Sequence, residues 1–494
     1  MPSSEKQQAV IIGSGIAGIA CSIRLAVKGY QVAVYEKNSF PGGKLHQIQL
    51  GDFRFDAGPS LFTMPHLVDE LFTLADKDPK NHFRYSRLNT VCKYFYEDGL
   101  VFEAVPEKET FAAQAAKAFG VDSSLILKKL EHSEKLLNLT GKLFLEQSLH
   151  VPSNYFSKDV LQTLANICSL DLTKTMHEAN LKSLKEPRLV QLFDRYATYN
   201  GSNPYKAPGV LNIIPALEHG QGAFLPEKGM HAITESLVNL AEELGVNFYY
   251  NSPVERIEYH KTIVKGIRVN GQLVPAEIVI SNADIVPTYR KLLPELPAPE
   301  RTLKQERSSS ALIFYWGMNS KFDELDVHNI FFSRDYEHEF NCIFNRKELS
   351  EDPTVYINIT SDKVKGDAPE NGQNWFVMIN VPHHDGTSWD DRVAISKERI
   401  IAKLERVLGK PVANHIACEE TLTPEKIEQQ TSSYLGALYG AASNNRFAAF
   451  LRHANFTSRI KNLYFCGGSV HPGGGIPLCL LSAKIVDELI GKTK

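Results

Sequence analysis

Three glycines near the start of the chain have the spacing that binds a dinucleotide. Gly13, Gly15 and Gly18 form a G-x-G-x-x-G turn directly after the apolar run 10–12. The first glycine permits the tight turn, and the second lets the backbone approach a pyrophosphate. The third lets the following helix pack closely on the sheet. This spacing predicts a strand, a phosphate-binding turn and a helix, in that order.

The segment after the turn supplies the other parts of a nucleotide site. The helix expected over 16–28 points its first N–H groups, at Ile16 and Ala17, and its positive dipole end toward the phosphates. Glu36 ends the second expected strand, 31–36, where a carboxylate accepts a hydrogen bond from a ribose 2′-hydroxyl. The same charge disfavours a 2′-phosphate, so NADP is not expected. An ordinary βαβ turn without a nucleotide is the alternative.

Further glycines at both ends of the chain favour a cofactor longer than NAD. Gly42, Gly43 and Lys44 follow the second strand, and the lysine is expected to neutralise pyrophosphate charge unless it is a solvated loop residue. Near the end, the apolar run 462–466 leads into a second glycine-rich segment, 467–477. One segment can hold a pyrophosphate and the other a ribityl chain and flavin, so the sequence favours FAD.

These residues, with others between them, resemble the bacterial-type carotenoid (phytoene) desaturase family of FAD-dependent oxidoreductases. Glu36 followed by 41–44 is similar to the E…PGG(R/K) signature of the wider superfamily. Residues 462–464, 471–477 and 482–484 resemble the C-terminal family pattern of NLY, HPG.GIP and SAK. The resemblance spans nearly the whole chain.

Two departures bear on the branch of this family. Residues 467–471 are closer to the 1-hydroxycarotenoid 3,4-desaturase branch, and Lys228 precedes Gly229 where the family often has two glycines. The resemblance implies FAD-dependent formation of the C-3,4 double bond of an acyclic or monocyclic 1-hydroxycarotenoid, by hydride transfer to the flavin. Phytoene desaturation is the alternative reaction. A non-oxidative carotenoid isomerase or a carotenoid-binding protein is the alternative from another class.

The resemblance also assigns residues to the cofactor. It implies that the backbone at Val254 pairs with the adenine. Beyond the glycine turn, the helix start and the acid, the predicted cofactor-binding residues are Lys37, Gly42, Gly43, Lys44, Gly58, Pro59, Ser60, Val254, Asn282, Ala283, Gly467, Gly468, Gly475, Ile476 and Pro477.

Desaturation by a flavin needs a dry channel and one base, and no nucleophile. Glu218, in a stretch that resembles the family's substrate region, is the first candidate for the base. Asp194 and His453 follow it. Either carboxylate can instead pair with Arg195, and the histidine can be a satisfied surface residue. His471 is a weaker candidate, expected mainly to order the turn beside the flavin.

The motifs predict an α/β fold with a Rossmann-like FAD-binding domain and a discontinuous α+β substrate domain, as in amine oxidases and desaturases. The FAD-binding domain is expected to comprise residues 1–85, 229–305 and 451–494. The substrate domain takes 86–228, expected to be mainly helical, and 306–450, where aromatic and β-branched runs predict strands. A chain of 494 residues is long enough for two such domains.

Composition argues against several other classes. A formal net charge of −3 gives no electrostatic basis for binding nucleic acid. The seven cysteines form no C-x-x-C pair and no cluster with metal-ligand spacing. Disulfide reductases and a metal site are therefore not expected, and the pattern is typical of a reducing cytoplasm. No signal peptide is visible before the first strand.

A carotenoid is insoluble in water, so a membrane lipid surface is an expected partner. Interrupted apolar helices around 125–175 are candidates for contact with one leaflet, although their apolar faces can equally pack on the protein core. We therefore expect a cytoplasmic protein that associates peripherally with the inner face of the membrane. No second dinucleotide motif occurs in the sequence, so oxygen or a membrane quinone is the expected electron acceptor.

Overall fold

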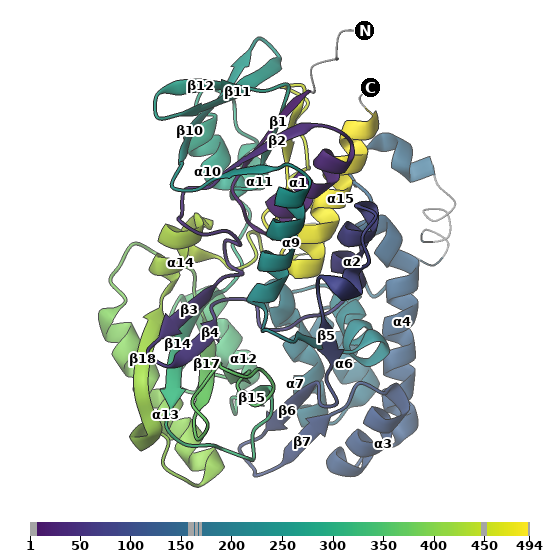
Figure 1. Cartoon of the computed structure of the whole chain (residues 1–494). Coiled ribbons are helices and arrows are strands. Elements are labelled where there is room, and N and C mark those ends of the chain that lie inside the picture. The colour runs from purple at the N-terminus through teal and green to yellow at the C-terminus, as the bar shows by residue number, and fades with distance from the viewer. Residues whose placement is uncertain (1–6, 157–162, 164–165, 167–169, 446–451, 493–494) are drawn as a thin grey trace.

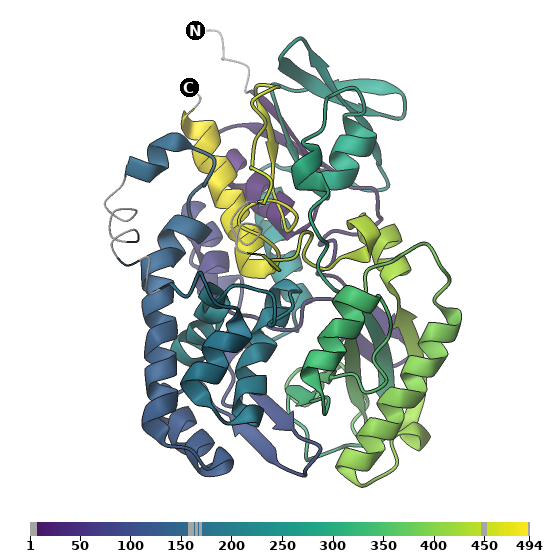
Figure 2. The ribbon, with the colours of Figure 1, turned by 180° about the vertical axis from the view of Figure 1, so that it is seen from behind.

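The computed structural model describes residues 7–156, 163, 166, 170–445 and 452–492. Figure 1 shows a region of sheet and helices around the chain termini, and a larger sheet with further helices at the opposite end. The C-terminal helix lies beside the first helix of the chain in both views (Figures 1 and 2). Distant parts of the sequence therefore build the first region together.

The sheet of the first region is parallel and combines three distant segments of the chain. Its strands lie in the order β19 (Leu463–Phe465), β13 (Ile278–Ser281), β1 (Gln8–Ile12), β2 (Gln31–Tyr35) and β9 (Asn247–Tyr249). Ile12 pairs with Tyr35 on one side and with Ser281 on the other. The turn after β1 thus opens at the carboxyl edge of the sheet, where α/β proteins bind ligands.

Alternate side chains of β1 enter two different cores. Ala9 and Ile11 face the helical core, and Val10 and Ile12 face the core on the other side of the sheet. The helical core is formed by α1 (Ile16–Val27), α2 (His66–Leu74), α9 (His231–Glu243) and α15 (Ile476–Lys492).

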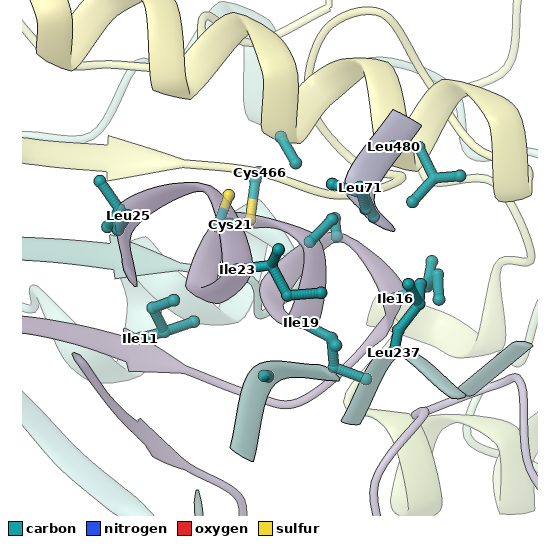
Figure 3. Close-up of a cluster of buried hydrophobic side chains, with 14 of the residues drawn as sticks. Ile11, Ile16, Ile19, Cys21, Ile23, Leu25, Leu71, Leu237, Cys466 and Leu480 are labelled. Carbon is teal, nitrogen blue, oxygen red and sulfur yellow. The ribbon is translucent and has the colours of Figure 1, made fainter. Parts of the chain in front are cut away.

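Figure 3 shows the apolar contact that fixes α1 in this core. Ile19 and Ile23 of α1 lie between Ile11 of the sheet and side chains of the neighbouring helices, including Leu237 and Leu480. All five are 3% exposed or less. Complete burial of an aliphatic side chain of this size stabilises the fold by about 2 kcal/mol, so this contact fixes the position of the turn that precedes α1.

The opposite face of the parallel sheet carries a smaller antiparallel sheet. It consists of β10 (Val254–His260), β11 (Ile263–Val269) and β12 (Gln272–Pro275), with α10 (Ile285–Pro287) and α11 (Glu300–Leu303) packed nearby. Asn270 and Gly271 join β11 to β12 with φ angles of 49° and 72°. Two residues in this left-handed region form the type I′ hairpin that the Asn-Gly pair predicts.

The second region is built on a seven-stranded mixed sheet. Its order is β18 (Ile416–Leu422), β14 (Ser310–Met318), β17 (Gln373–Val381), β16 (Val355–Ile359), β15 (His328–Phe331), β6 (Cys92–Phe95) and β7 (Val101–Ala104). The predicted strands at 312–316, 354–359 and 375–379 are β14, β16 and β17. The mainly helical prediction for 86–228 misses β6 and β7, which join the sheet through parallel pairing of β6 with β15.

Helices cover both faces of this sheet. They are α3 (Lys108–Phe119), α4 (Ser123–Leu145), α6 (Met176–Leu184), α7 (Pro187–Asp194), α8 (Ile214–Ala216), α12 (Tyr336–Asn341), α13 (Asp390–Leu408) and α14 (Pro424–Thr431). Ile400 and Leu404 of α13 pack on one face. The other face, which carries Ile313, Phe376 and Met378, borders a cavity.

Two short strand pairs link the regions. They are β3 (Gln47–Leu50) with β4 (Phe53–Asp56), and β5 (Tyr85–Arg87) with β8 (Phe224–Pro226). Asp56 accepts hydrogen bonds from the backbone nitrogens of Met230 and His231 at 2.8 and 2.9 Å, so it fixes the start of α9 to β4.

Within the described residues, no helix combines the length and the apolar character that crossing a membrane requires. Of the predicted apolar helices around 125–175, α4 ends at Leu145, and the stretch 160–170 lies largely outside the described residues.

Candidate active site

A cavity of about 810 Å³ lies where the two regions meet. Its lining comes from the turn after β1, the segment after β13, the glycine-rich segment after β19 and one face of the seven-stranded sheet. The carboxyl edge of the parallel sheet therefore opens into the same space as the second region.

The predicted cofactor-binding residues gather on one side of this cavity. Those that line it are Gly13, Gly15, Ile16, Ala17, Glu36, Lys37, Gly42, Gly43, Lys44, Gly58, Pro59, Ser60, Val254, Asn282, Ala283, Gly467, Gly468, Gly475, Ile476 and Pro477. The exception is Gly18, where an added Cβ would lie 2.3 Å from the Gly13 carbonyl oxygen. Gly18 therefore serves the packing of α1 against the turn, as its place in the motif predicts.

The lining has the form that a dinucleotide requires. Gly13 has a φ of 89°, and a Cβ at Gly43 would lie 3.4 Å from the Gly15 Cα, so bare backbone forms this wall. Among the described residues, no side chain caps the start of α1, so its first N–H groups are available to an anion. At Gly475, just before α15, an added Cβ would meet no atom of the described part of the chain within 4 Å. The residues present fit a pyrophosphate at one helix start and further cofactor atoms at the other.

Glu36 is buried beside the first turn. Its Oε2 accepts hydrogen bonds from the backbone nitrogen and the Oγ of Ser14 at 2.8 and 2.9 Å, and its Oε1 accepts one from the backbone nitrogen of Asn38 at 2.9 Å. These bonds hold the carboxylate at the end of β2. Each oxygen has two lone pairs, so the group can still accept from a ribose hydroxyl.

Two cationic side chains that line the cavity donate hydrogen bonds to backbone carbonyl groups. Lys44, predicted to neutralise pyrophosphate charge, donates to the Leu438 carbonyl oxygen at 2.7 Å, and burial lowers its pKa to about 8 while Asp284 opposes that shift. Arg452 donates to the Tyr439 carbonyl oxygen at 2.7 Å, and burial lowers its pKa to about 10. Sequence reasoning missed the arginine because it belongs to no motif.

The rest of the cavity is mainly apolar and lies between the seven-stranded sheet and the helices of the second region. Its apolar lining includes Leu61, Val91, Phe144, Leu145, Val210, Leu211, Ile213, Ile214, Leu217, Ile313, Ile330, Phe376 and Met378. Walls of this kind suit a long hydrocarbon. We call this part of the cavity the apolar arm.

Glu218 lies on this lining and is almost completely buried. Its Oε2 is 3.3 Å from Arg195 Nη2 and accepts a hydrogen bond from the Tyr196 hydroxyl at 2.8 Å. The Tyr199 hydroxyl donates to Oε1. Burial raises the pKa of the carboxyl, and the guanidinium charge opposes the rise. The predicted pairing with Arg195 is therefore present, in a position that also faces the cavity.

The other predicted candidates for the base lie outside the cavity lining. The Asp194 carboxylate is 2.6 Å from His177 Nδ1, and burial raises its pKa. His453 Nε2 is 3.1 Å from the Tyr289 hydroxyl, and this histidine is buried, which corrects its alternative as a surface residue. His471 is also buried. The geometry therefore favours Glu218 over these three.

A polar chain across the two regions was not predicted. The Ser60 Oγ is 2.8 Å from the Tyr356 hydroxyl, which is 2.7 Å from His328 Nδ1. All three residues line the cavity. No local signal in the sequence relates residues this far apart, because the sheet topology alone brings them together.

Four buried histidines predict acid sensitivity of the fold. Burial lowers the pKa of His219 to about 3 and the pKa values of His328, His453 and His471 to about 4. The unfolded value is about 6.5, so folding favours the neutral rings, and the stability they contribute is complete above that pH and lost as pH falls toward about 4. Each contributes a slope of about 1.4 kcal/mol per pH unit in that window. Unfolding midpoints in urea at pH 7.5, 6.5 and 5.5 measure the decline.

The control for this prediction is His453→Gln, which removes one titrating ring outside the cavity lining. The variant is expected to show a shallower decline of stability below about pH 6.5 than the parent protein. An unchanged midpoint between pH 7.5 and 5.5 in the parent would contradict the prediction.

Comparisons with known proteins agree with this geometry. The family profile described as flavin containing amine oxidoreductase matches residues 16–486. A protein of Flavobacterium sp. (strain P99-3), named 1-hydroxycarotenoid 3,4-desaturase, is 53% identical over 487 residues, which cover 99% of each chain. The 4,4′-diapolycopene oxygenase of Methylomonas sp is 30% identical and also covers 99% of each chain.

Two solved structures share the fold at low sequence identity. An oxidoreductase from Methanosarcina mazei has a TM-score of 0.65 and 13% identity, over 97% of this chain and 100% of its own. Wild-type putrescine oxidase bound to putrescine has a TM-score of 0.62 and 14% identity, over 99% of both chains. The profile match and the relative that is 53% identical show that the chain belongs to the flavin-containing amine oxidoreductase family, on the carotenoid desaturase branch that its motifs predict.

Proposed function

We propose that the protein is an FAD-dependent desaturase that forms the C-3,4 double bond of a 1-hydroxycarotenoid. The observation that carries this proposal is the continuous cavity, which joins the dinucleotide turn to an apolar arm. The reaction of the relative that is 53% identical supports the choice of substrate and bond. Phytoene desaturation is the alternative reaction, and it needs the same arrangement of cofactor site and cavity. The product analysis described below distinguishes the two reactions.

We propose that the lining glycines, the two helix starts and Glu36 hold FAD. Bound FAD supplies a hydride acceptor, which is the chemistry that an unactivated carbon–carbon bond requires. The protein has to align the substrate, exclude water and accept one proton. The apolar arm performs the first two tasks, because it leaves a polyene few orientations and gives water few partners.

We propose that Glu218 accepts the proton. Desaturation removes one hydrogen with its electron pair and one as a proton from the neighbouring carbon, so a base must reach the second carbon. Arg195 holds the carboxylate in place at 3.3 Å, and the tyrosine hydroxyls orient it. The positive charge that develops on the substrate is spread along the conjugated chain, which reduces the stabilisation that the protein has to supply.

We propose peripheral contact with the cytoplasmic face of a membrane as the route for the substrate. The short helix η2 (Pro152–Phe156) carries Tyr155, 47% exposed, and Phe156, 88% exposed. It follows α4, whose last residues Phe144 and Leu145 line the cavity. An exposed aromatic pair that follows the cavity-lining end of a helix in the sequence suits a lipid surface. Oxygen or a membrane quinone is the proposed electron acceptor.

Product analysis tests the proposed reaction. FAD-loaded protein is incubated with liposomes that carry either phytoene or a 1-hydroxycarotenoid. We expect a red-shifted product two hydrogens lighter from the hydroxylated substrate and none from phytoene. Conversion of phytoene alone would reject the 3,4-desaturase assignment. If neither substrate is converted, carotenoid desaturation itself is rejected.

The variant Gly15→Ala tests the cofactor site. The added Cβ would lie 2.6 Å from Asn282 Nδ2 and would occupy the turn beside the pyrophosphate. We expect the dissociation constant for FAD to rise at least about tenfold, measured by flavin fluorescence. Gly491→Ala, in the last turn of α15, is the matched control and should bind FAD normally, because its new Cβ would be 3.5 Å from the nearest atom, Lys28 Nζ. Equal affinity of all three proteins would contradict the site.

A pair of carboxamide variants tests the base. Glu218→Gln keeps the size of the side chain but not its basicity, so we expect kcat to fall by about 100-fold or more while FAD stays bound. Asp194→Asn removes a buried carboxylate outside the cavity and should retain kcat. Loss of turnover in Asp194→Asn with normal turnover in Glu218→Gln would reverse the assignment.

A further inference from the structure

Three polar atoms of cavity-lining residues have no hydrogen-bond partner among the described residues. They are Nε2 of His328, Nε of Arg195 and Oδ1 of Asn200. His328 is 2% exposed and Arg195 is 7% exposed. A buried polar atom without a partner costs about 1–3 kcal/mol. A polar group of a ligand in the cavity would therefore stabilise each of these three atoms.

The contacts of His328 fix which ring nitrogen carries the proton. Asn358 Nδ2 donates to the Val327 carbonyl oxygen at 2.8 Å, which shows that the NH₂ end of this amide, and not its oxygen, faces Val327. The same Nδ2 is 3.3 Å from His328 Nδ1, which must therefore accept. Burial lowers the pKa of the ring to about 4, so it is neutral near pH 7. A neutral imidazole that accepts at Nδ1 carries its proton at Nε2, and Nε2 is a donor.

The position of this donor suits a group close to the reacting bond. The Nδ1 partner Tyr356 is 2.8 Å from Ser60, two residues after Gly58. A Cβ at Gly58 would lie 2.0 Å from the Lys44 carbonyl oxygen, so this loop packs on the predicted cofactor segment. In a 1-hydroxycarotenoid, two bonds separate C-1 from C-3. The site that binds the hydroxyl must therefore lie on the cofactor side of the apolar arm.

Arg195 lies in the same part of the cavity. Its guanidinium carbon lies 5.2 Å from the centre of the Tyr94 ring, and Tyr94 pairs with Ile330 of β15, two residues from His328. The same guanidinium holds the carboxylate of Glu218 at 3.3 Å. Asn200 belongs to the same short helix, η4 (Arg195–Asn200). The three unpartnered atoms therefore come from two elements, η4 and β15.

We propose that Arg195, Asn200 and His328 bind the tertiary hydroxyl group of the substrate, an inference that rests on the proposed function. A hydroxyl has two lone pairs and one proton, which match two N–H donors and one amide oxygen. The guanidinium Nε and the imidazole Nε2 donate to the hydroxyl oxygen, and the amide Oδ1 accepts its proton. A hydrocarbon in the same place leaves all three atoms unpaired, and a site built for a hydroxyl rejects such an analogue strongly.

The test compares two ligands that differ only in the hydroxyl. A 1-hydroxycarotenoid and the same polyene without the hydroxyl are titrated from liposomes into FAD-loaded protein, and quenching of flavin fluorescence gives both dissociation constants. The wild-type protein should prefer the hydroxylated ligand by about 100-fold or more. His328→Phe and Asn200→Leu should each reduce this preference at least about tenfold, through weaker binding of the hydroxylated ligand alone. The ratios of kcat/KM should follow.

Tyr96→Phe is the matched control. Tyr96 is buried in the second region, its hydroxyl donates to the Arg188 carbonyl oxygen, and it does not line the cavity. Removal of the Tyr96 hydroxyl should leave the preference for the hydroxylated ligand unchanged. If His328→Phe does not fold, Asn200→Leu alone tests the inference. Asn200 is only partly buried, so its substitution disturbs the fold less.

Three results would overturn the inference. An unchanged preference in both variants would mean that water satisfies these atoms, and an equal loss for both ligands would mean that the residues act only in the fold. A wild-type protein without a preference also rejects the hydroxyl site, even where the C-3,4 product forms. A clear preference with a different product rejects the proposed reaction and keeps the site.

Discussion

The site depends on one contact, in which Asn282 holds together the ends of three parallel strands. Its backbone nitrogen donates to the Ile12 carbonyl oxygen at 2.8 Å, and its side-chain Nδ2 donates to the Gly13 carbonyl oxygen at 3.3 Å. A Cβ at Gly467 would lie 2.7 Å from its Oδ1. The first turn and the C-terminal glycine segment can therefore share one cavity only because glycine backbone lies on both sides of this amide. The apolar packing of α1 and α15 keeps the arrangement in place.

A second constraint is the burial of two charged side chains in the apolar arm. Arg195 and Glu218 are both buried, and a buried ion pair is stable only where further hydrogen bonds satisfy the remaining polar atoms. Tyr196 and Tyr199 provide some of these bonds. The Nε of the arginine has no such partner among the described residues. A polar cluster in the apolar arm lowers the stability of the fold. The same unpaired atoms can form hydrogen bonds to a substrate that carries a hydroxyl beside its reacting bond.

The local motifs of the FAD-binding segments could be predicted from the sequence because each part follows the previous one along the chain. The turn at Gly13, the helix behind it and Glu36 occupy the expected positions, and the Asn270–Gly271 hairpin forms where the dipeptide predicts it. Strong β-branched runs also predicted three strands of the large sheet. Such features depend on interactions within a few residues.

The remaining features depend on tertiary pairing and could not be predicted. The strands β6 and β7 join the large sheet through a partner more than two hundred residues away, which their own sequence does not indicate. Ser60 and Tyr356 are 296 positions apart and meet only because two regions close over one cavity. Asp194 and His453 were candidates by residue type, and the fold places neither of them on the lining of the cavity. The choice of Glu218 depended on a resemblance, and its contact with the cavity comes from the fold.

The central claim is that the cofactor and the polyene occupy one cavity and exchange hydrogen directly. Rapid anaerobic mixing of FAD-loaded protein with a 1-hydroxycarotenoid tests this most directly, with flavin and polyene absorbance followed together. Direct transfer predicts that oxidised flavin is lost at the same rate as the polyene absorbance shifts to the red, in a ratio of one flavin to one double bond. A red shift with the flavin still oxidised, or no change in either signal at saturating substrate, would contradict it.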